Sequence, residues 1–243
     1  MPHTLEHAHT PEAISERIAE PGTPSYLRDW VLGGIDGAVT TFAIVAGVAG
    51  AGLSAGVVII LGIANLIADG LSMAAGNFSG VKAENDEYDK LYATERRHIE
   101  TTPEGERAEV REILAKKGFE GDDLTRAVET ISADEKRWIE FMLVEEFGLT
   151  ITRRSAMMSA LATFVAFVIC GAVPLVPYVF GTANSFAVAC VAVGFVFFGI
   201  GALKACWSMT SWWLSGLETL AIGGIAAGAA YWIGDVLEGV VGI

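Results

Sequence analysis

Carboxylates and one imidazole recur at helical spacing in the most highly charged part of the chain, residues 82–150. Side chains three or four residues apart share one face of a helix, and like charges on one face lower its stability unless something neutralises them. A divalent cation would do so, because carboxylate oxygens with an imidazole or a thioether suit ferrous or manganous ions. The spacing therefore predicts a metal site with the ligands Glu95, His98, Glu106, Glu109, Met142 and Glu146, and with Glu112 and Glu145 on the same helix faces.

Two simpler interpretations of these residues stay open at this point. The carboxylates could form a solvated helix face whose charge is balanced by Arg96, Arg107 and Arg111, since runs of charge usually face solvent. Met142 could belong to the apolar core of an amphipathic helix, which is the usual place of a methionine.

A second group of polar residues lies inside long apolar stretches. Asp36 and Asp69 are the only charged residues in 30–81, and Asn65 and Met73 lie close to Asp69 in the sequence. A carboxylate at such depth costs about 3 kcal/mol to insert into a bilayer, and neither aspartate has a basic residue within a span to pair with. These four residues are therefore the predicted transport pathway. The alternative is that both aspartates hydrogen-bond the backbone of glycine-rich helix kinks.

The composition predicts the elements that position both groups. The 243 residues are 52% hydrophobic, yet 29 acids against 16 bases give a net charge of −13, which argues against a nucleic-acid partner. About 20 apolar residues suffice to cross a bilayer as a helix. We expect an all-α membrane protein with a small helical bundle inserted between the second and third spans, the spans being 30–50, 57–80, 155–176, 184–204 and 212–234.

Capping signals divide the insert into helices. Thr102 and Ser132 are the predicted N-caps, the latter through a capping box with Glu135. The second span continues without a breaker, so one long helix is expected to leave the membrane. The expected boundaries are Ile99 for the end of that helix, and then Thr102–Gly118, Asp122–Ile131 and Ser132–Gly148.

The basic residues predict the orientation. All 16 lie in the N-terminal tail, in the insert, or at Lys204, so alternate loops carry every positive charge. The positive-inside rule then puts the N-terminus and the insert in the cytosol and the C-terminus on the opposite side. The expected segments are a tail (1–28), two spans (29–81), the cytosolic insert (82–152) and three spans (153–243). The absence of a targeting extension favours a bacterial-type plasma membrane.

Two short patterns concern partners. Glycines four residues apart let helices approach closely, and they predict a homodimer; the pairs are Gly33–Gly37, Gly52–Gly56 and Gly224–Gly228. A tail cluster of His3, His7 and His9 is a further candidate for metal capture, although such tails are usually disordered.

Four segments combine these motifs: LRDWVLGGIDGAVTTFAIVAGVAGA, ANLIADGLSMAAGNF, ERRHIETTPEGERAEVREIL and FMLVEEFGL. Together they resemble the vacuolar iron transporter family of ferrous and manganous ion exporters, over almost all of 27–243. The resemblance implies five transmembrane helices, a homodimer, a cytosolic metal-binding domain between helices two and three, and proton antiport out of the cytosol. It also implies that Asp36 and Met73 are pathway residues, and that the cytosolic ligands are Glu95, Glu106, Glu109, Met142 and Glu146.

The chain departs from the family pattern at three positions. His98 stands where a glutamate is usual, which removes one negative charge from the site. Leu143 stands where a second methionine is often found, which removes one soft ligand. Asn65 stands where some relatives have a carboxylate, so the family's proton stoichiometry does not transfer directly.

Three functions compete on these grounds. The first is a transporter, not an enzyme, that exchanges cytosolic Fe²⁺ or Mn²⁺ for protons and holds no permanent cofactor. The second is a membrane-anchored di-iron oxidase, because Glu95 and His98 form the E-x-x-H pair of ferritin-like sites, which need two such pairs. The third is a metal sensor or adaptor in the insert. The resemblance favours the first.

Overall fold

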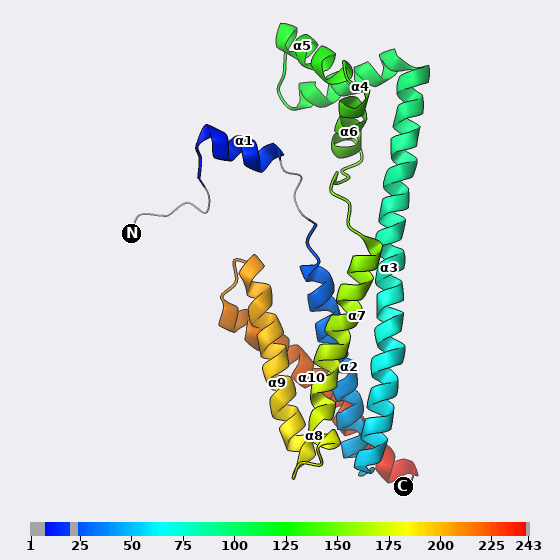
Figure 1. Cartoon of the computed structure of the whole chain (residues 1–243), viewed down its shortest axis with the longest axis vertical. Helices are drawn as coiled ribbons and strands as arrows, with labels where there is room; N and C mark the ends of the chain where they lie inside the picture. The colour runs from blue at the N-terminus through cyan, green and yellow to red at the C-terminus, as the bar shows by residue number, and fades with distance from the viewer. Residues whose placement is uncertain (1–7, 20–23, 242–243) are drawn as a thin grey trace. The chain divides into compact units, whose positions relative to one another are not determined.

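The computed structural model describes residues 8–19 and 24–241, and every regular element in these ranges is a helix. Five helices are long and apolar enough to cross a membrane, which confirms the five predicted spans. Figure 1 shows α3 as one uninterrupted helix that continues well beyond its apolar part, as the sequence predicted. The five are α2 (Leu27–Gly50), α3 (Ala55–Thr101), α7 (Ala156–Ala172) with its extension, α9 (Ser185–Lys204) and α10 (Trp212–Val241).

The chain divides into two compact units. The membrane unit consists of Tyr26–Lys82 and Ser155–Ile243, and the insert unit contains Ala83–Arg154 together with the N-terminal segment that forms α1 (Pro11–Ala19). In the membrane unit α2 is the central helix, because it contacts α7, α9 and α10. Its buried side chains include Phe42 and Val45, which join the apolar core of this unit.

Close helix contact in the membrane unit depends on two glycines of α2. A Cβ atom on Gly33 would lie 2.2 Å from the carbonyl oxygen of Thr163, and one on Gly37 would lie 2.3 Å from that of Phe167. The Gly33–Gly37 pair therefore packs α2 against α7 within one chain instead of facing a second copy. Gly224 and Gly228 of α10 have no atom within 4 Å of such a Cβ.

The third span extends further than the sequence predicted. This span was expected to end at residue 176, but η1 (Val173–Leu175) and α8 (Val176–Val179) continue the helical path of α7 to residue 179. Pro174 and Pro177 each occupy the first turn of a new helical segment, where a missing N–H costs nothing. The chain reverses only at residues 180–184, where Gly181 and Asn184 adopt positive φ.

Three short helices follow α3 in the insert unit. They are α4 (Pro103–Lys116), α5 (Gly121–Ser132) and α6 (Glu135–Glu145). Their shared apolar core is built around Val110, Leu114, Val128, Trp138 and Met142.

Of the two predicted N-cap residues of the insert, Thr102 is confirmed and Ser132 is wrong. Thr102 precedes α4 as expected, but its hydroxyl donates back to the carbonyl of His98 (3.1 Å) instead of capping the new helix. Ser132 is the last residue of α5, and Asp134 caps α6 by accepting a hydrogen bond from the N–H of Arg137 (2.8 Å). The shift arises because α5 includes Ser132, which leaves Asp134 as the residue directly before α6.

The packing at Gly37 gives a test with a matched control. Gly37→Ala should lower the stability of the folded chain by about 1–3 kcal/mol, because the methyl group overlaps the Phe167 carbonyl. That loss corresponds to a melting temperature lower by roughly 2–10 °C for a chain of this size. Gly199→Ala adds the same methyl group where no atom lies within 4 Å. Thermal unfolding in detergent should separate the two variants, and an equal loss in both would contradict this packing.

Candidate metal site

The end of α3 and the start of α4 bring acidic side chains together. The N–H of Thr102 still bonds to the carbonyl of His98 (2.7 Å), and Pro103 immediately opens α4. The two helices are therefore joined with almost no loop. Glu95 and His98 lie in the last two turns of α3, and Glu106 lies in the first turn of α4.

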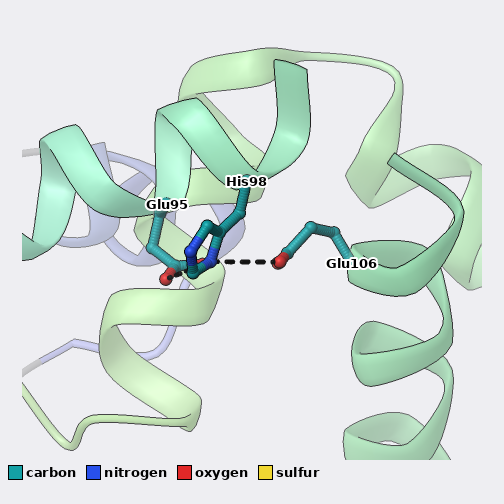
Figure 2. A group of neighbouring side chains, drawn as sticks. All are labelled: Glu95, His98 and Glu106. Carbon is teal, nitrogen blue, oxygen red and sulfur yellow. Dashed lines mark ion pairs between the residues drawn. The ribbon is translucent and has the colours of Figure 1, made fainter. Parts of the chain in front are cut away.

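His98 lies between two carboxylates. Its Nδ1 atom is 3.4 Å from Oε1 of Glu106 and 3.8 Å from Oε1 of Glu95. Figure 2 shows that Glu95 and His98 project from the same helix and that Glu106 approaches the imidazole from the next one. One ligand atom from each of the three side chains lies within 4.8 Å of the others, close enough for all three to hold one ion.

The carboxylates of Glu95 and Glu106 are buried without enough hydrogen-bond partners. Glu95 is 2% exposed and Glu106 is 4% exposed, whereas the His98 side chain is 44% exposed. Oε2 of Glu95 and Oε2 of Glu106 are buried and have no hydrogen-bond partner among the described residues when both groups are ionised. A buried charge in this condition costs several kcal/mol unless a proton or a cation compensates it.

The raised pKa values of the carboxylates in this cluster also indicate that burial makes their charged forms unfavourable. Burial, followed by the charges of Glu106, Glu146 and Glu109, raises the pKa of Glu95 to about 7. Burial and the charge of Glu109 also raise the pKa values of Glu106 and Glu146, while His98 partly lowers both. Four carboxylates and one imidazole therefore interact electrostatically at one place. Oxygen ligands with one imidazole suit Fe²⁺ or Mn²⁺.

The nearby bases do not neutralise this cluster. Arg96 forms ion pairs with Glu100 and Glu135, at 3.3 and 3.1 Å. Arg107 pairs with Glu104 and stacks over the ring of Trp138. The interpretation as a solvated face balanced by arginines therefore does not fit Glu95 and Glu106, which are buried.

The other predicted ligands take three different positions. Glu109 and Glu146 are exposed at the edge of the cluster, where their charges act on the buried pair. Met142 is fully buried in the apolar core of the insert. Glu112 and Glu145 have cationic partners of their own, Lys116 at 3.6 Å and Lys117 at 2.7 Å. Of the tail cluster, His3 and His7 lie outside the described residues, and His9 precedes α1.

The predicted pathway residues of the membrane unit lie on α2 and α3. Asp36 is half-buried, and its carboxylate is close enough to Asp69 to interact electrostatically. The amide of Asn65 donates to the hydroxyls of Thr40 and Thr41, both at 3.3 Å, so it joins α3 to α2. Met73 packs against the apolar core.

Sequence reasoning missed one buried polar group, Asp29. This carboxylate is 2% exposed and accepts a hydrogen bond from the amide of Asn77 (2.9 Å), which also donates to the hydroxyl of Thr163 (2.7 Å). Asp29 adjoins Arg28 at the edge of the first span, a position at which a charged side chain can equally reach solvent. The spacing of Ser159 and Thr163 on one face of α7 was the signal that could have located this network.

Comparison with known proteins identifies the family of the chain. A sequence profile described as the VIT family matches residues 27–235, which include the first four spans, most of the fifth and the cluster. The chain belongs to the VIT family. The resemblance stated from the motifs is thereby confirmed.

Several VIT-family relatives align over most of their own length. A vacuolar iron transporter of Centaurea cyanus is 35% identical over 210 residues, which cover 84% of this chain and 85% of the relative. Vacuolar iron transporter 1 of Arabidopsis thaliana is 34% identical, covering 87% and 86%. The vacuolar iron transporter of Toxoplasma gondii is 34% identical, covering 89% and 76%.

The raised pKa of Glu95 predicts how the metal-free insert responds to pH. The unfolded chain releases this proton near the ordinary carboxyl pKa of about 4.5, whereas the folded chain keeps it until about pH 7. The stability that Glu95 contributes is therefore fully present below pH 4.5 and is lost as the pH rises to 7. Hydrogen exchange of α3–α4 peptides, corrected for intrinsic rates and measured with a chelator, should be about tenfold slower at pH 5.5 than at pH 7.5.

The control for this measurement is a carboxylate elsewhere in the insert. Glu95→Gln should flatten the pH dependence, because the amide needs no proton, and Glu129→Gln on the exposed face of α5 should leave it unchanged. If the wild-type insert exchanged at the same corrected rate at both pH values, the buried carboxylate would not hold a proton at neutral pH.

Proposed function

We propose that this VIT-family protein carries Fe²⁺, and also Mn²⁺, out of the compartment that contains the insert, in exchange for protons. The observation that carries the proposal is the pair of buried carboxylates, Glu95 and Glu106, whose Oε2 atoms have no hydrogen-bond partner among the described residues. Five apolar helices in the same chain supply the means to cross a membrane. The relatives named above are all called iron transporters, which supports transport over enzymatic activity.

The insert is proposed to collect the ion. Glu95, His98 and Glu106 form the inner ligand set, and Glu109 and Glu146 attract the cation at its edge. Binding replaces the proton of Glu95 with a metal ion, so that capture releases acid on the same side. Met142, which is fully buried in the apolar core of the insert on α6, is the proposed soft ligand.

The membrane unit is proposed to pass the ion on. Asp36 and Asp69 interact electrostatically, and neither forms an ion pair with another described residue. Two carboxylates in this situation favour a proton or a cation between the helices. Met73 and Asn65 complete the proposed pathway on α3.

Orientation and assembly are part of the same proposal. The distribution of bases supports a cytosolic insert and a C-terminus on the opposite side. The names of the relatives refer to a vacuole, so they lend no support to the plasma membrane expected from the sequence. A homodimer is proposed on the open face of α10, where Gly224 and Gly228 have no neighbouring atom within 4 Å.

The alternative of a di-iron oxidase has less support. Such a site needs two E-x-x-H pairs and two further glutamates on four long helices. Among the described residues the cluster contains one histidine, and its second helix, α4, has 14 residues.

The pathway assignment is tested by transport in proteoliposomes. Asp36→Asn should reduce Fe²⁺ flux about a hundredfold or more. The substitution removes the negative charge that would compensate the ion for the loss of its hydration shell inside the membrane. Asp235→Asn makes the same change on α10, far from Asp36 in the sequence, and should keep most of the flux. Flux of Fe²⁺ and Mn²⁺ with and without a pH gradient tests proton exchange, and an Asp36→Asn variant that transports at the wild-type rate would refute the pathway.

The role of the insert is tested by metal binding to the full chain. Glu95→Gln/Glu106→Gln should weaken Mn²⁺ binding by tenfold or more in calorimetry, whereas Glu120→Gln/Glu129→Gln, on an exposed surface, should not. Flux at low metal concentration should fall in parallel with affinity. If the cluster variant lost binding and kept its flux at every metal concentration, the insert would be a sensor and not a collector.

A further inference from the structure

Polar side chains join α2 and α3 of the membrane unit at three successive levels. At the level nearest the insert along α3, the amide of Asn77 donates to Oδ1 of Asp29 (2.9 Å). The middle level is the interacting pair of Asp36 and Asp69. At the third level the amide of Asn65 donates to two hydroxyls of α2. The aspartates of the proposed pathway therefore lie between two hydrogen-bonded levels.

The three levels follow one antiparallel register of α2 and α3. From Asp29 to Asp36 the chain advances seven residues along α2, and from Asn77 back to Asp69 is eight residues along α3. The next step, to the level of Asn65, is four residues on both helices. At a rise of 1.5 Å per residue, the level of Asn77 lies roughly 11–12 Å from the two aspartates. On the proposed pathway, an ion that leaves the insert passes this level before it reaches them.

The amide of Asn77 ties α3 to two other helices. One of its two hydrogens goes to Asp29, and the other goes to the hydroxyl of Thr163 on α7 (2.7 Å). Thr163 in turn donates its own hydrogen to the carbonyl of Ser159 (3.0 Å). Asp29 lies in the first turn of α2, where the helix dipole favours a negatively charged side chain. Because hydrogen bonds to charged acceptors are the stronger ones, the contact with Asp29 is the main tie.

The packing of α3 leaves it freer to move than the pair of α2 and α7. A Cβ atom on Gly33 of α2 would overlap the backbone of α7. The glycines of α3 meet side chains instead, because a Cβ atom on Gly62 would meet Leu175 and one on Gly70 would meet the ring of Phe164. Side chains can change rotamer, whereas backbone atoms in contact cannot give way. At these positions α3 can therefore shift against a rigid α2–α7 pair once its hydrogen bonds are released.

We propose that Asn77 is a positioning residue that closes the α2–α3 contact on the side of the insert. While its amide is bonded to Asp29 and Thr163, α3 is held against α2 and α7, and the way to Asp36 and Asp69 is closed from that side. Release of both bonds lets this part of α3 move away and opens the way. The consequence for transport rests on the proposed pathway, whereas the closure itself does not.

The distance between α3 and α7 tests the closure without any transport. Spin labels at Gly80→Cys and Met157→Cys, both exposed positions, report this distance by pulsed electron paramagnetic resonance in a parent chain whose three native cysteines are replaced by alanine. Asn77→Ala should raise the ratio of the longer to the shorter distance about tenfold, because it removes a hydrogen bond to a charged group. Ser79→Ala removes a hydroxyl that bonds only within α3 (2.8 Å) and should change nothing. Equal distance distributions in Asn77→Ala and the parent would overturn the proposal.

A second pair of variants keeps the test decisive if Asn77→Ala does not fold. Thr163→Val keeps the size of the side chain and loses the hydroxyl that accepts from Asn77, so it should raise the share of the longer distance severalfold. Thr163→Ser keeps the hydroxyl and should behave like the parent. If the valine and serine variants gave the same distribution, packing and not hydrogen bonding would hold α3, and the proposal would be refuted.

Transport kinetics separate this role from that of an ion ligand. In proteoliposomes supplied with Mn²⁺ on the side of the insert, Asn77→Ala should lower KM up to about tenfold, because a larger fraction of the molecules is open to the ion. The value of kcat should fall as well, because α3 must close again before the ion leaves on the other side. A fall in kcat with an unchanged KM would indicate damaged protein, and a raised KM would indicate a lost ligand; either result would overturn the proposal. If the parent carried neither Mn²⁺ nor Fe²⁺, the proposed function would fail, and the distance measurement would still decide whether Asn77 holds α3.

Discussion

The cost of burying carboxylates without a counter-cation governs the insert of this protein. Glu95 and Glu106 are shielded from solvent, yet the arginines around them pair with other acids. A carboxylate with a pKa of about 7 is poised between its two states at neutral pH. The cluster can therefore exchange a proton for a divalent ion with little change in its net charge. An exposed acidic surface would attract the same ion but would hold no proton to exchange.

The rest of the insert maintains that unfavourable burial. Trp138, Val110 and Leu114 form the core that fixes α4 and α6 against the end of α3. The connection through Thr102 and Pro103 contains no loop, and it therefore holds Glu106 close to Glu95. In the membrane unit the same rigidity comes from backbone contact, since Gly37 brings α2 against α7 without intervening side chains.

The sequence predicted the elements well because their signals are long. A prediction of a span rests on about 20 apolar residues, so no single position decides it. The five spans and the length of α3 were therefore predicted correctly. Local signals were less reliable. Ser132 and Asp134 are both good N-cap residues, and the choice between them depends on where α5 ends, which tertiary packing decides.

The candidate site was predictable as a set of residues but not as a geometry. Helical spacing joined Glu106, Glu109 and Glu112 on one face of α4, yet only Glu106 is buried, and it is the one that His98 of α3 contacts. Glu112 pairs with Lys116 four residues later on the same helix, as helical spacing allows, whereas the pair of Glu145 with Lys117 joins distant parts of the sequence and could not be predicted from spacing. The Gly33–Gly37 pair likewise permits a close contact without identifying the partner helix, which proved to be α7 of the same chain.

His98 gives the cluster a property that a fifth carboxylate would not. Its Nδ1 atom faces both Glu95 and Glu106, and when protonated it lowers the pKa values of Glu106 and Glu146. A glutamate at this position would add to the repulsion and make the buried acids hold their protons more tightly. The imidazole instead keeps those acids closer to ionised while the site is empty of metal. The same nitrogen can serve as a metal ligand. The histidine therefore reduces the competition of protons with the metal and still leaves the number of ligand atoms unchanged.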